Sequence, residues 1–340
     1  MTAHAHPLKY LLPGWYALVM GLSGLALAWH RAQPLMGEMA GAIALVLGGL
    51  AAVVFVLLAA ASLLRWQRHP EAWAEDRRHP VRHAFIAALP ISLILLATVA
   101  VVLFGASAPA RALWWAGALG QLWVTLWVLG RWWRPATAGG AAGGAAGGLS
   151  WAGVTPALFM PIVGNVLLPL AGVPLGQADW AAAQFGIGLM FWPVVLVLLV
   201  VRIAQQGLWP ERLLPTSFIA IAPPAVIGLS ALQLGAPLLL GWMLWGMALF
   251  CAAWVALLAP RIRNQPFALT HWGLSFPLAA LAALTLRLAT PGGLLAVLGP
   301  LLLALASLVI LGLLLATVRG LRDGTLLAPE PVAAIVPAAP

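Results

Sequence analysis

Charge and cysteine are both scarce in this sequence. Only 7% of the 340 residues are charged, against about 25% in a typical soluble domain, while 63% are hydrophobic. The mean hydropathy is +1.02. These values exclude a soluble globular domain and indicate a protein that crosses a membrane several times. The single cysteine, Cys251, excludes a disulfide within the chain.

Acidic residues are outnumbered by basic ones, with 8 Asp and Glu against 17 Lys and Arg and a formal net charge of +9. In a soluble protein this excess would suggest a nucleic-acid partner. In a membrane protein, basic residues orient the spans and need no partner, so we expect no binding of nucleic acid. The N-terminal stretch MTAHAHPLKYLLPG lacks the features of a cleaved signal peptide, and we expect it to be retained.

Long apolar runs make up most of the chain. A helix needs roughly 20 mostly apolar residues to cross a bilayer, and ten segments meet this requirement. They are 11–30, 38–64, 83–104, 110–131, 152–171, 181–203, 213–233, 236–259, 267–289 and 292–318. We predict a single all-α integral membrane domain over residues 1–322 and a disordered tail over 323–340. A flexible Gly/Ala linker, 138–148, joins the fourth and fifth spans.

Basic residues divide unevenly between the two sides of these ten spans. With the N-terminus inside, fourteen fall on the cytoplasmic side and three, Arg31, Arg111 and Arg287, on the outer side. Basic residues concentrate on the cytoplasmic side of membrane proteins. The division therefore predicts a multi-pass protein of the plasma (inner) membrane with both termini in the cytoplasm.

Helix-breaking residues distinguish the odd-numbered spans from the even-numbered ones. The third, fifth, seventh and ninth spans have central prolines and the first has glycines, although Pro193 of the sixth span is an exception. The helix-breaking residues of the odd-numbered spans are Pro90, Pro161, Pro223, Pro277, Gly21 and Gly24. Irregular backbone at membrane depth is tolerated where it is buried in protein or lines a water-filled cavity. We predict five helical hairpins, with the odd helices around a central pore and the even helices outside, facing lipid.

Four motifs on the odd spans together resemble one known family. They are HPVRHAFIAALPIS (79–92), TPALFMPIVGNVLLPLAG (155–172), LLPTSFIAIAPPAVIGL (213–229) and HWGLSFPLAALA (271–282). In this order they resemble the tellurite-resistance/dicarboxylate transporter family. Its members include the bacterial TehA proteins, fungal malate and sulfite transporters and plant guard-cell slow anion channels. The resemblance implies ten helices around a central pore, in a homotrimer with one pore per protomer.

The same resemblance implies a gate. In this family a phenylalanine of the ninth helix occludes the pore, and the matching residue here is Phe276. First-helix residues that pack near that ring in the TehA proteins match Ala17 and Met20, with Gly21 following. Members often carry an aromatic pair before the ninth-helix motif, where this chain has His271-Trp272, so pH sensitivity through His271 stays open.

The spans have no charged residue at their centres, which argues against a tight charged anion site and against a proton relay of carboxylates. The favoured interpretation is a channel for small anions, oxyanions such as tellurite or sulfite, or C4-dicarboxylates. A proton-coupled malate carrier is the alternative, with only His30 and His271 placed near span ends to carry a proton. A membrane-embedded enzyme is a distant third, because paired carboxylates are missing from the spans.

Metal binding is the remaining possibility. His79 and His83 have an i,i+4 spacing that could ligate a metal on one helix face. Arginines surround them and no third ligand is in view, which favours a solvated connector. We therefore expect no metal and no cofactor.

Overall fold

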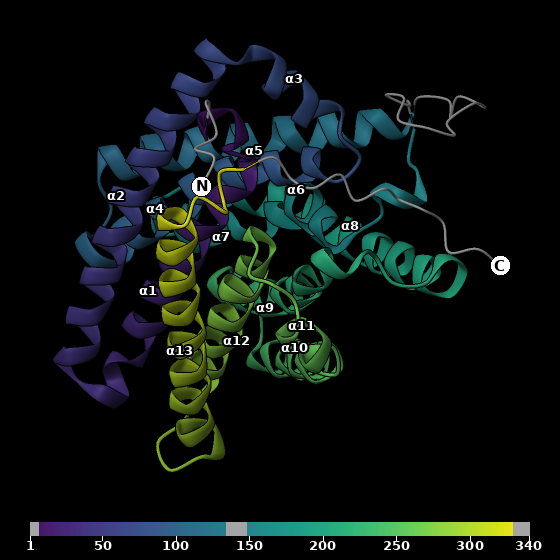
Figure 1. Ribbon diagram of the computed structural model, residues 1–340. Helices are drawn as coiled ribbons and strands as arrows, with labels where there is room; N and C mark the ends of the chain where they lie inside the picture. The colour runs from purple at the N-terminus through teal and green to yellow at the C-terminus, as the bar shows by residue number, and fades with distance from the viewer. Residues whose placement is uncertain (1–6, 134–147, 329–340) are drawn as a thin grey trace.

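The computed structural model describes residues 7–133 and 148–328, and this part of the chain is helical without any strand. The all-α prediction is therefore confirmed. Residues 138–147 of the predicted linker and 329–340 of the predicted tail lie outside the described residues. In Figure 1, α1 (Ala17–Met36), α12 (Ser275–Leu288) and α13 (Leu294–Arg322) run side by side.

Eight helices of the described residues are long and apolar enough to cross a membrane. They are α2 (Glu38–Arg68), η3 with α4 (Arg82–Phe104), α5 (Ala108–Trp132), α8 (Ala178–Gln206), η7 with α9 (Glu211–Gln233), α10 (Leu238–Ala256), η8 with α12 (Leu269–Leu288) and α13. Each begins and ends within four residues of a predicted span. The other two predicted spans, 11–30 and 152–171, correspond to η2 (Pro13–Tyr16) with α1 and to the shorter apolar stretch Pro156–Gly172.

Burial separates these helices into two classes. In the most apolar 18-residue window of Arg82–Phe104, Glu211–Gln233 and Leu269–Leu288, 72%, 89% and 72% of the residues are buried. The corresponding windows of α2, α5, α8, α10 and α13 are only 17–39% buried. A helix that is apolar all round and yet exposed is suited to lipid rather than to water. Most residues of α1 and of Pro156–Gly172 are buried as well. These two stretches and the three buried segments are called the inner segments here, and α2, α5, α8, α10 and α13 the outer helices.

The inner segments contact one another in a closed ring. α1 packs against α4 (Ala88–Phe104) and α12, α12 packs against α9 (Ala222–Gln233), and η6 (Gly164–Leu167) packs against both α9 and α4. Each inner segment also packs against the outer helix that follows it in the chain. These pairs are α1 with α2, α4 with α5, η6 with α8, α9 with α10, and α12 with α13.

The inner segments begin as 3-10 helices and continue as α-helices. The junctions join η2 to α1, η3 (Arg82–Ala87) to α4, η5 (Pro156–Leu158) to α6 (Phe159–Val163), η7 (Glu211–Ile221) to α9, and η8 (Leu269–Leu274) to α12. Pro90, Pro161, Pro224 and Pro277 are each the third residue of an α-helix. N–H groups of a first turn have no partner within the α-helix, so proline is tolerated there. The predicted mid-helix break is therefore a change of helix type.

The charged connector after α2 contains a helix that the sequence did not predict, α3 (Pro70–Arg78). Nη1 of Arg65, in the last turn of α2, lies 2.7 Å from Oδ2 of Asp76, and both side chains are buried. Burial raises the pKa of the Asp76 carboxyl, and the neighbouring Arg65 guanidinium opposes that rise. This ion pair fastens α3 to the end of α2.

Candidate functional site, an apolar cavity inside the ring

A cavity of about 70 Å³ lies where the five inner segments meet. Its lining residues are Ala17, Met20, Phe85, Ile91, Phe159, Met160, Val163, Gly164, Val166, Leu167, Ile219, Ala222, Pro223, Val226, Leu269, Thr270, Trp272, Gly273, Phe276 and Pro277. Every one belongs to an inner segment. Among the described residues, α2, α5, α8, α10 and α13 contribute nothing to this lining.

The cavity wall is neutral. Its described lining holds no acidic, basic or histidine side chain, and its polar side-chain atoms belong to Thr270 and Trp272. Thr270 Oγ1 donates a hydrogen bond to the carbonyl of Arg212 at 2.6 Å. Trp272 Nε1 donates to Thr317 Oγ1 of α13 at 2.9 Å. Both groups are thus satisfied within the protein, and the cavity presents hydrocarbon and aromatic rings.

The Phe276 ring packs directly against the backbone of α1. A methyl group added at Gly24 would lie 2.8 Å from Cδ2 of Phe276, closer than real contacts of that kind. A methyl group added at Gly21 would lie 2.7 Å from Cβ of Ser275. Glycine at both positions lets α1 and α12 approach this closely. Phe276 is only 8% exposed, so its ring is held between α1 and the cavity.

Five of the residues predicted to line a pore do line this cavity. They are Ala17 and Met20 of α1, Pro223 of α9, and Phe276 and Pro277 of α12. The structure thereby brings together three stretches that lie more than 50 residues apart in the sequence. Their roles in conduction stay predictions.

The other predicted residues lie outside the lining. Gly21 and Gly24 form the contact with α12. Pro90 faces α5, and its Cβ would lie 3.2 Å from a methyl group added at Gly120. Pro161 is buried, and side chains of α5 donate to its carbonyl. His271 is half-buried near the start of η8, where its Nδ1 accepts a hydrogen bond from the N–H of Ala268 at 3.2 Å.

Polar side chains of two outer helices hold the irregular fifth segment in place. Gln121 Nε2 of α5 donates to the carbonyl of Met160 at 2.9 Å. Asn165 Nδ2 donates to Thr125 Oγ1, and Gln184 Nε2 of α8 donates to Asn165 Oδ1, both at 2.8 Å. These side chains are buried. The sequence reasoning missed all three outer residues, although Gln121 and Thr125 share one face of an apolar span at i,i+4 spacing.

Serine hydroxyls play a similar part at other junctions. Ser92 Oγ donates to the carbonyl of Ala88 at 2.7 Å, and Ser275 Oγ donates to the carbonyl of Trp272 at 2.6 Å. A change from 3-10 to α-helix disturbs the regular backbone pattern, and hydrocarbon offers no alternative partner. Side chains therefore satisfy backbone carbonyls at these junctions.

The histidines of the connector lie away from the cavity. His79 Nδ1 accepts a hydrogen bond from the N–H of Arg82 at 3.1 Å, and His83 Nδ1 lies 3.0 Å from the carbonyl of His79. Within residues 7–133 and 148–328, no three side chains of His, Cys, Asp or Glu gather as metal ligands would. The two rings instead contact the backbone between α3 and η3.

A comparison with known families identifies this architecture. The family model SLAC1, described as a voltage-dependent anion channel, matches residues 10–318. The chain belongs to this family. The match covers the whole inner ring and nearly all of α13. The SLAC1 family comprises anion channels and transporters, and the chain is a multi-pass membrane protein of this family.

Curated relatives in the SLAC1 family come from plants, bacteria and archaea. The S-type anion channel SLAH2 of Arabidopsis thaliana is 25% identical over 277 residues, which are 80% of this chain and 51% of SLAH2. The tellurite resistance protein TehA homolog of Haemophilus influenzae is 25% identical over 272 residues, covering 79% of this chain and 78% of the relative. The uncharacterized transporter MJ0576 of Methanocaldococcus jannaschii is 22% identical over 302 residues, covering 81% of this chain and 83% of that protein.

The chain therefore spans about half the length of the plant channel and most of the length of the bacterial and archaeal relatives. The predicted membership of the TehA-like family is confirmed, since both a TehA homolog and S-type anion channels are among the relatives.

Proposed function

We propose that this SLAC1-family protein is an anion channel whose pathway runs through the centre of the inner ring and is closed by Phe276. One observation carries the proposal. The cavity is lined by all five inner segments and, in the described residues, by none of the outer helices. Its neutral wall neither repels an anion nor traps it, as conduction requires. The permeant species are small inorganic anions, oxyanions such as tellurite or sulfite, or C4-dicarboxylates.

The proposed channel crosses the membrane ten times, as five hairpins around the pore. The closed ring of inner contacts and the pairing of each inner segment with the next outer helix support this arrangement. The charge division of fourteen to three supports cytoplasmic termini and an inner-membrane location. A homotrimer with one pore per protomer rests on the family resemblance.

Phe276 closes the pathway as a neutral plug. Its ring lies against Gly24 on one side and the cavity on the other. It is also the second residue of α12, immediately after the junction with η8. Opening requires the ring to leave this position, and the junction is where α12 changes its hydrogen-bond pattern. An anion then crosses a constriction of apolar groups after shedding part of its hydration.

Anion current through the purified protein in planar bilayers tests the proposal. Wild type is expected to be nearly silent, and Phe276→Ala is expected to raise the chloride or nitrate current about tenfold or more, a change of only ~1.4 kcal/mol in the barrier. Phe250→Ala is the matched control, because Phe250 lies on α10 and is 69% exposed. That variant is expected to stay silent.

A different outcome would establish the coupled carrier instead. Suppose that wild type, Phe276→Ala and Phe250→Ala all carry no current, and that labelled malate accumulates in vesicles only under a pH gradient. Phe276 is then not the gate. The described cavity lining offers no protonatable side chain for such coupling. His271, half-buried outside that lining, would be the first residue to replace in that case.

A further inference from the structure

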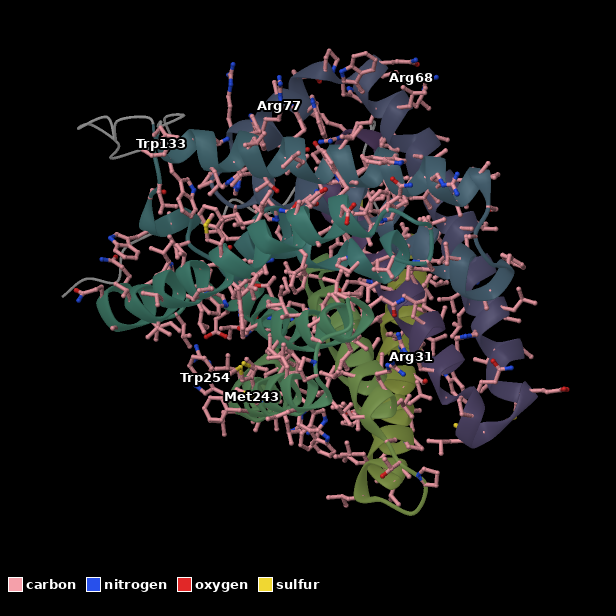
Figure 2. All side chains as sticks on the ribbon, turned by 180° about the vertical axis from the view of Figure 1, so that it is seen from behind. Arg31, Arg68, Arg77, Trp133, Met243 and Trp254 are labelled. Atoms are coloured by element: carbon pink, nitrogen blue, oxygen red, sulfur yellow. The ribbon has the colours of Figure 1, made fainter. Side chains whose placement is uncertain are left out.

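Two arginines come together at one end of the proposed pathway. Arg31 is half-buried near the end of α1, and Arg287 is exposed in the last turn of α12. α1 and α12 pack along each other, and the two guanidinium groups are close enough for their positive charges to interact. Figure 2 labels Arg31 beside the ribbons of the C-terminal helices that α1 contacts.

The helical period places both arginines on the faces that line the cavity. Arg31 follows Met20 by 11 residues, and Arg287 follows Phe276 by the same interval. Eleven residues are close to three turns, so each arginine lies almost directly above its cavity residue, about 16 Å along the helix. The helices are in parallel register, because Gly21 faces Ser275 and Gly24 faces Ala279. Both cations therefore lie beyond Phe276 at the same end.

No carboxylate neutralises this pair in the part of the chain that the structure describes. Neither guanidinium makes an ion pair or a side-chain hydrogen bond there, whereas Arg65 and Arg261 each pair with an acid. The acids Glu38 and Asp179, also placed on the outer side, are exposed and pair with neither arginine. The C-terminus of α12 favours the Arg287 cation in its last turn, whereas Arg31 lies before the last turn of α1. This helix end does not remove the repulsion between the two like charges, which is strong near a low-dielectric wall.

We propose that Arg31 and Arg287 bind one small anion between them and form a docking site at the outer mouth of the pathway. This proposal rests on the proposed channel function for its role, although binding can be measured without conduction. The ligand class is a small anionic group such as chloride, nitrate or an oxyanion. The aqueous ion is favoured over a lipid phosphate, because both arginines continue the cavity-lining faces of inner helices rather than an outer helix.

Chlorine NMR line broadening of aqueous chloride, with purified protein in detergent, tests binding directly. Arg31→Gln and Arg287→Gln are each expected to weaken chloride affinity about fivefold, the effect of one nearby unit charge in a largely aqueous setting. Arg31→Lys keeps the charge and is expected to retain most of the affinity. Arg111→Gln, which removes an exposed cation at the start of α5, is the matched control and is expected to change nothing. Equal affinity in all four variants would overturn the proposal.

A second measurement on the same samples distinguishes an aqueous anion from a lipid phosphate as the ligand. If the glutamine variants lose co-purified phospholipid phosphorus while chloride binding is unchanged, the pair is a lipid site and the proposal is wrong. If Arg31→Gln does not fold, Arg287→Gln carries the test, because its exposed side chain makes no described hydrogen bond or ion pair that folding could depend on.

Current recordings test whether the anion site affects conduction, and they distinguish the anion-site proposal from the channel proposal. In a Phe276→Ala background, Arg31→Gln should raise the chloride concentration for half-maximal current about fivefold, and the effect should fade near 1 M salt, where charges are screened within about 3 Å. If Phe276→Ala passes no current while the glutamine variants lose chloride binding, the channel proposal fails and the anion site stands. A normal current that is independent of both arginines, with unchanged binding, overturns the anion site and leaves the channel.

Discussion

α12 and α13 are neighbours in sequence and in space, and they differ in almost every structural respect. The inner segment Leu269–Leu288 has 20 residues, begins as a 3-10 helix and is 72% buried over its apolar window. The outer helix α13 has 29 residues, is a regular α-helix and is 28% buried. The inner sequence is constrained by protein neighbours, so glycine, proline and hydroxyl residues have specific partners there. The outer sequence needs mainly to be apolar and helical.

The largest expected effect is a loss of stability at the end of α2, where an outer helix carries a buried charged residue. The window of α2 is only 17% buried, yet Arg65 in its last turn is buried and paired with Asp76. Arg65→Met leaves a buried carboxylate and should destabilise the protein by about 3 kcal/mol, the low end for a broken buried pair, because Arg82 remains 3.6 Å from Asp76.

The control for this prediction is Arg261→Met. Arg261 pairs with Glu211, and the two side chains are 50% and 47% exposed, so the loss should be about 0–1 kcal/mol. Thermal unfolding midpoints in detergent micelles compare the two variants. Similar shifts for both would show that the connector pair is not buried in solution.

A smaller loss of stability is expected where the outer helix α5 packs against the inner helix α4. A methyl group at Gly117 of α5 would lie 2.7 Å from Ile94 Cγ1 and 2.9 Å from the Ile94 backbone nitrogen, whereas a methyl group at Gly130 of the same helix meets nothing within 4 Å. Gly117→Ala should cost about 1–3 kcal/mol through overpacking. Gly130→Ala should be neutral or stabilising by up to about 1 kcal/mol, since alanine favours helix. A reversed order of unfolding midpoints would contradict the inner and outer assignment.

The smallest effect is on anion current, and it concerns the contact between Gly24 and the Phe276 ring. Gly24→Ala places a methyl group against Phe276 and should displace its ring. Part of the overpacking energy is relieved when the ring leaves, so the current should rise about fivefold, a change of ~1 kcal/mol, and by less than in Phe276→Ala. Gly21→Ala meets Ser275 and Trp272 instead, and it serves as the control in the same bilayer recordings. A leak in Gly21→Ala as large as in Gly24→Ala would argue against a specific role for the ring.

The regular outer helices could be predicted well from the sequence. The span predicted at 38–64 is Glu38–Arg68 in the structure, and the one predicted at 110–131 is Ala108–Trp132, because long apolar runs determine such boundaries. The helix α3 was missed because its residues are charged and polar, so it gives no hydropathy signal. The 3-10 halves were missed for another reason: hydropathy does not distinguish one helix type from another.

The site was predictable only in part. Motifs pointed to Phe276, Ala17 and Met20, which do meet at the cavity. Trp272 and Phe159 also line it and belong to two of the family motifs, but the motifs alone do not place them at the cavity, because their placement depends on how five distant segments pack. Gly24 was predicted as a pore-lining or helix-kink residue of the first span. Its observed role is to make room for the Phe276 ring, which no local property of the first span reveals.

The 3-10 halves also change how far a short sequence reaches. A 3-10 helix rises about 2.0 Å per residue, against 1.5 Å for an α-helix. The stretch Pro156–Gly172 contains two 3-10 pieces, η5 and η6, of three and four residues. It therefore extends roughly 29 Å, whereas a uniform α-helix of its length would reach only about 25 Å. Seventeen residues then match a hydrocarbon layer about 30 Å thick. A length threshold calibrated on α-helices therefore overlooks apolar stretches that are built this way.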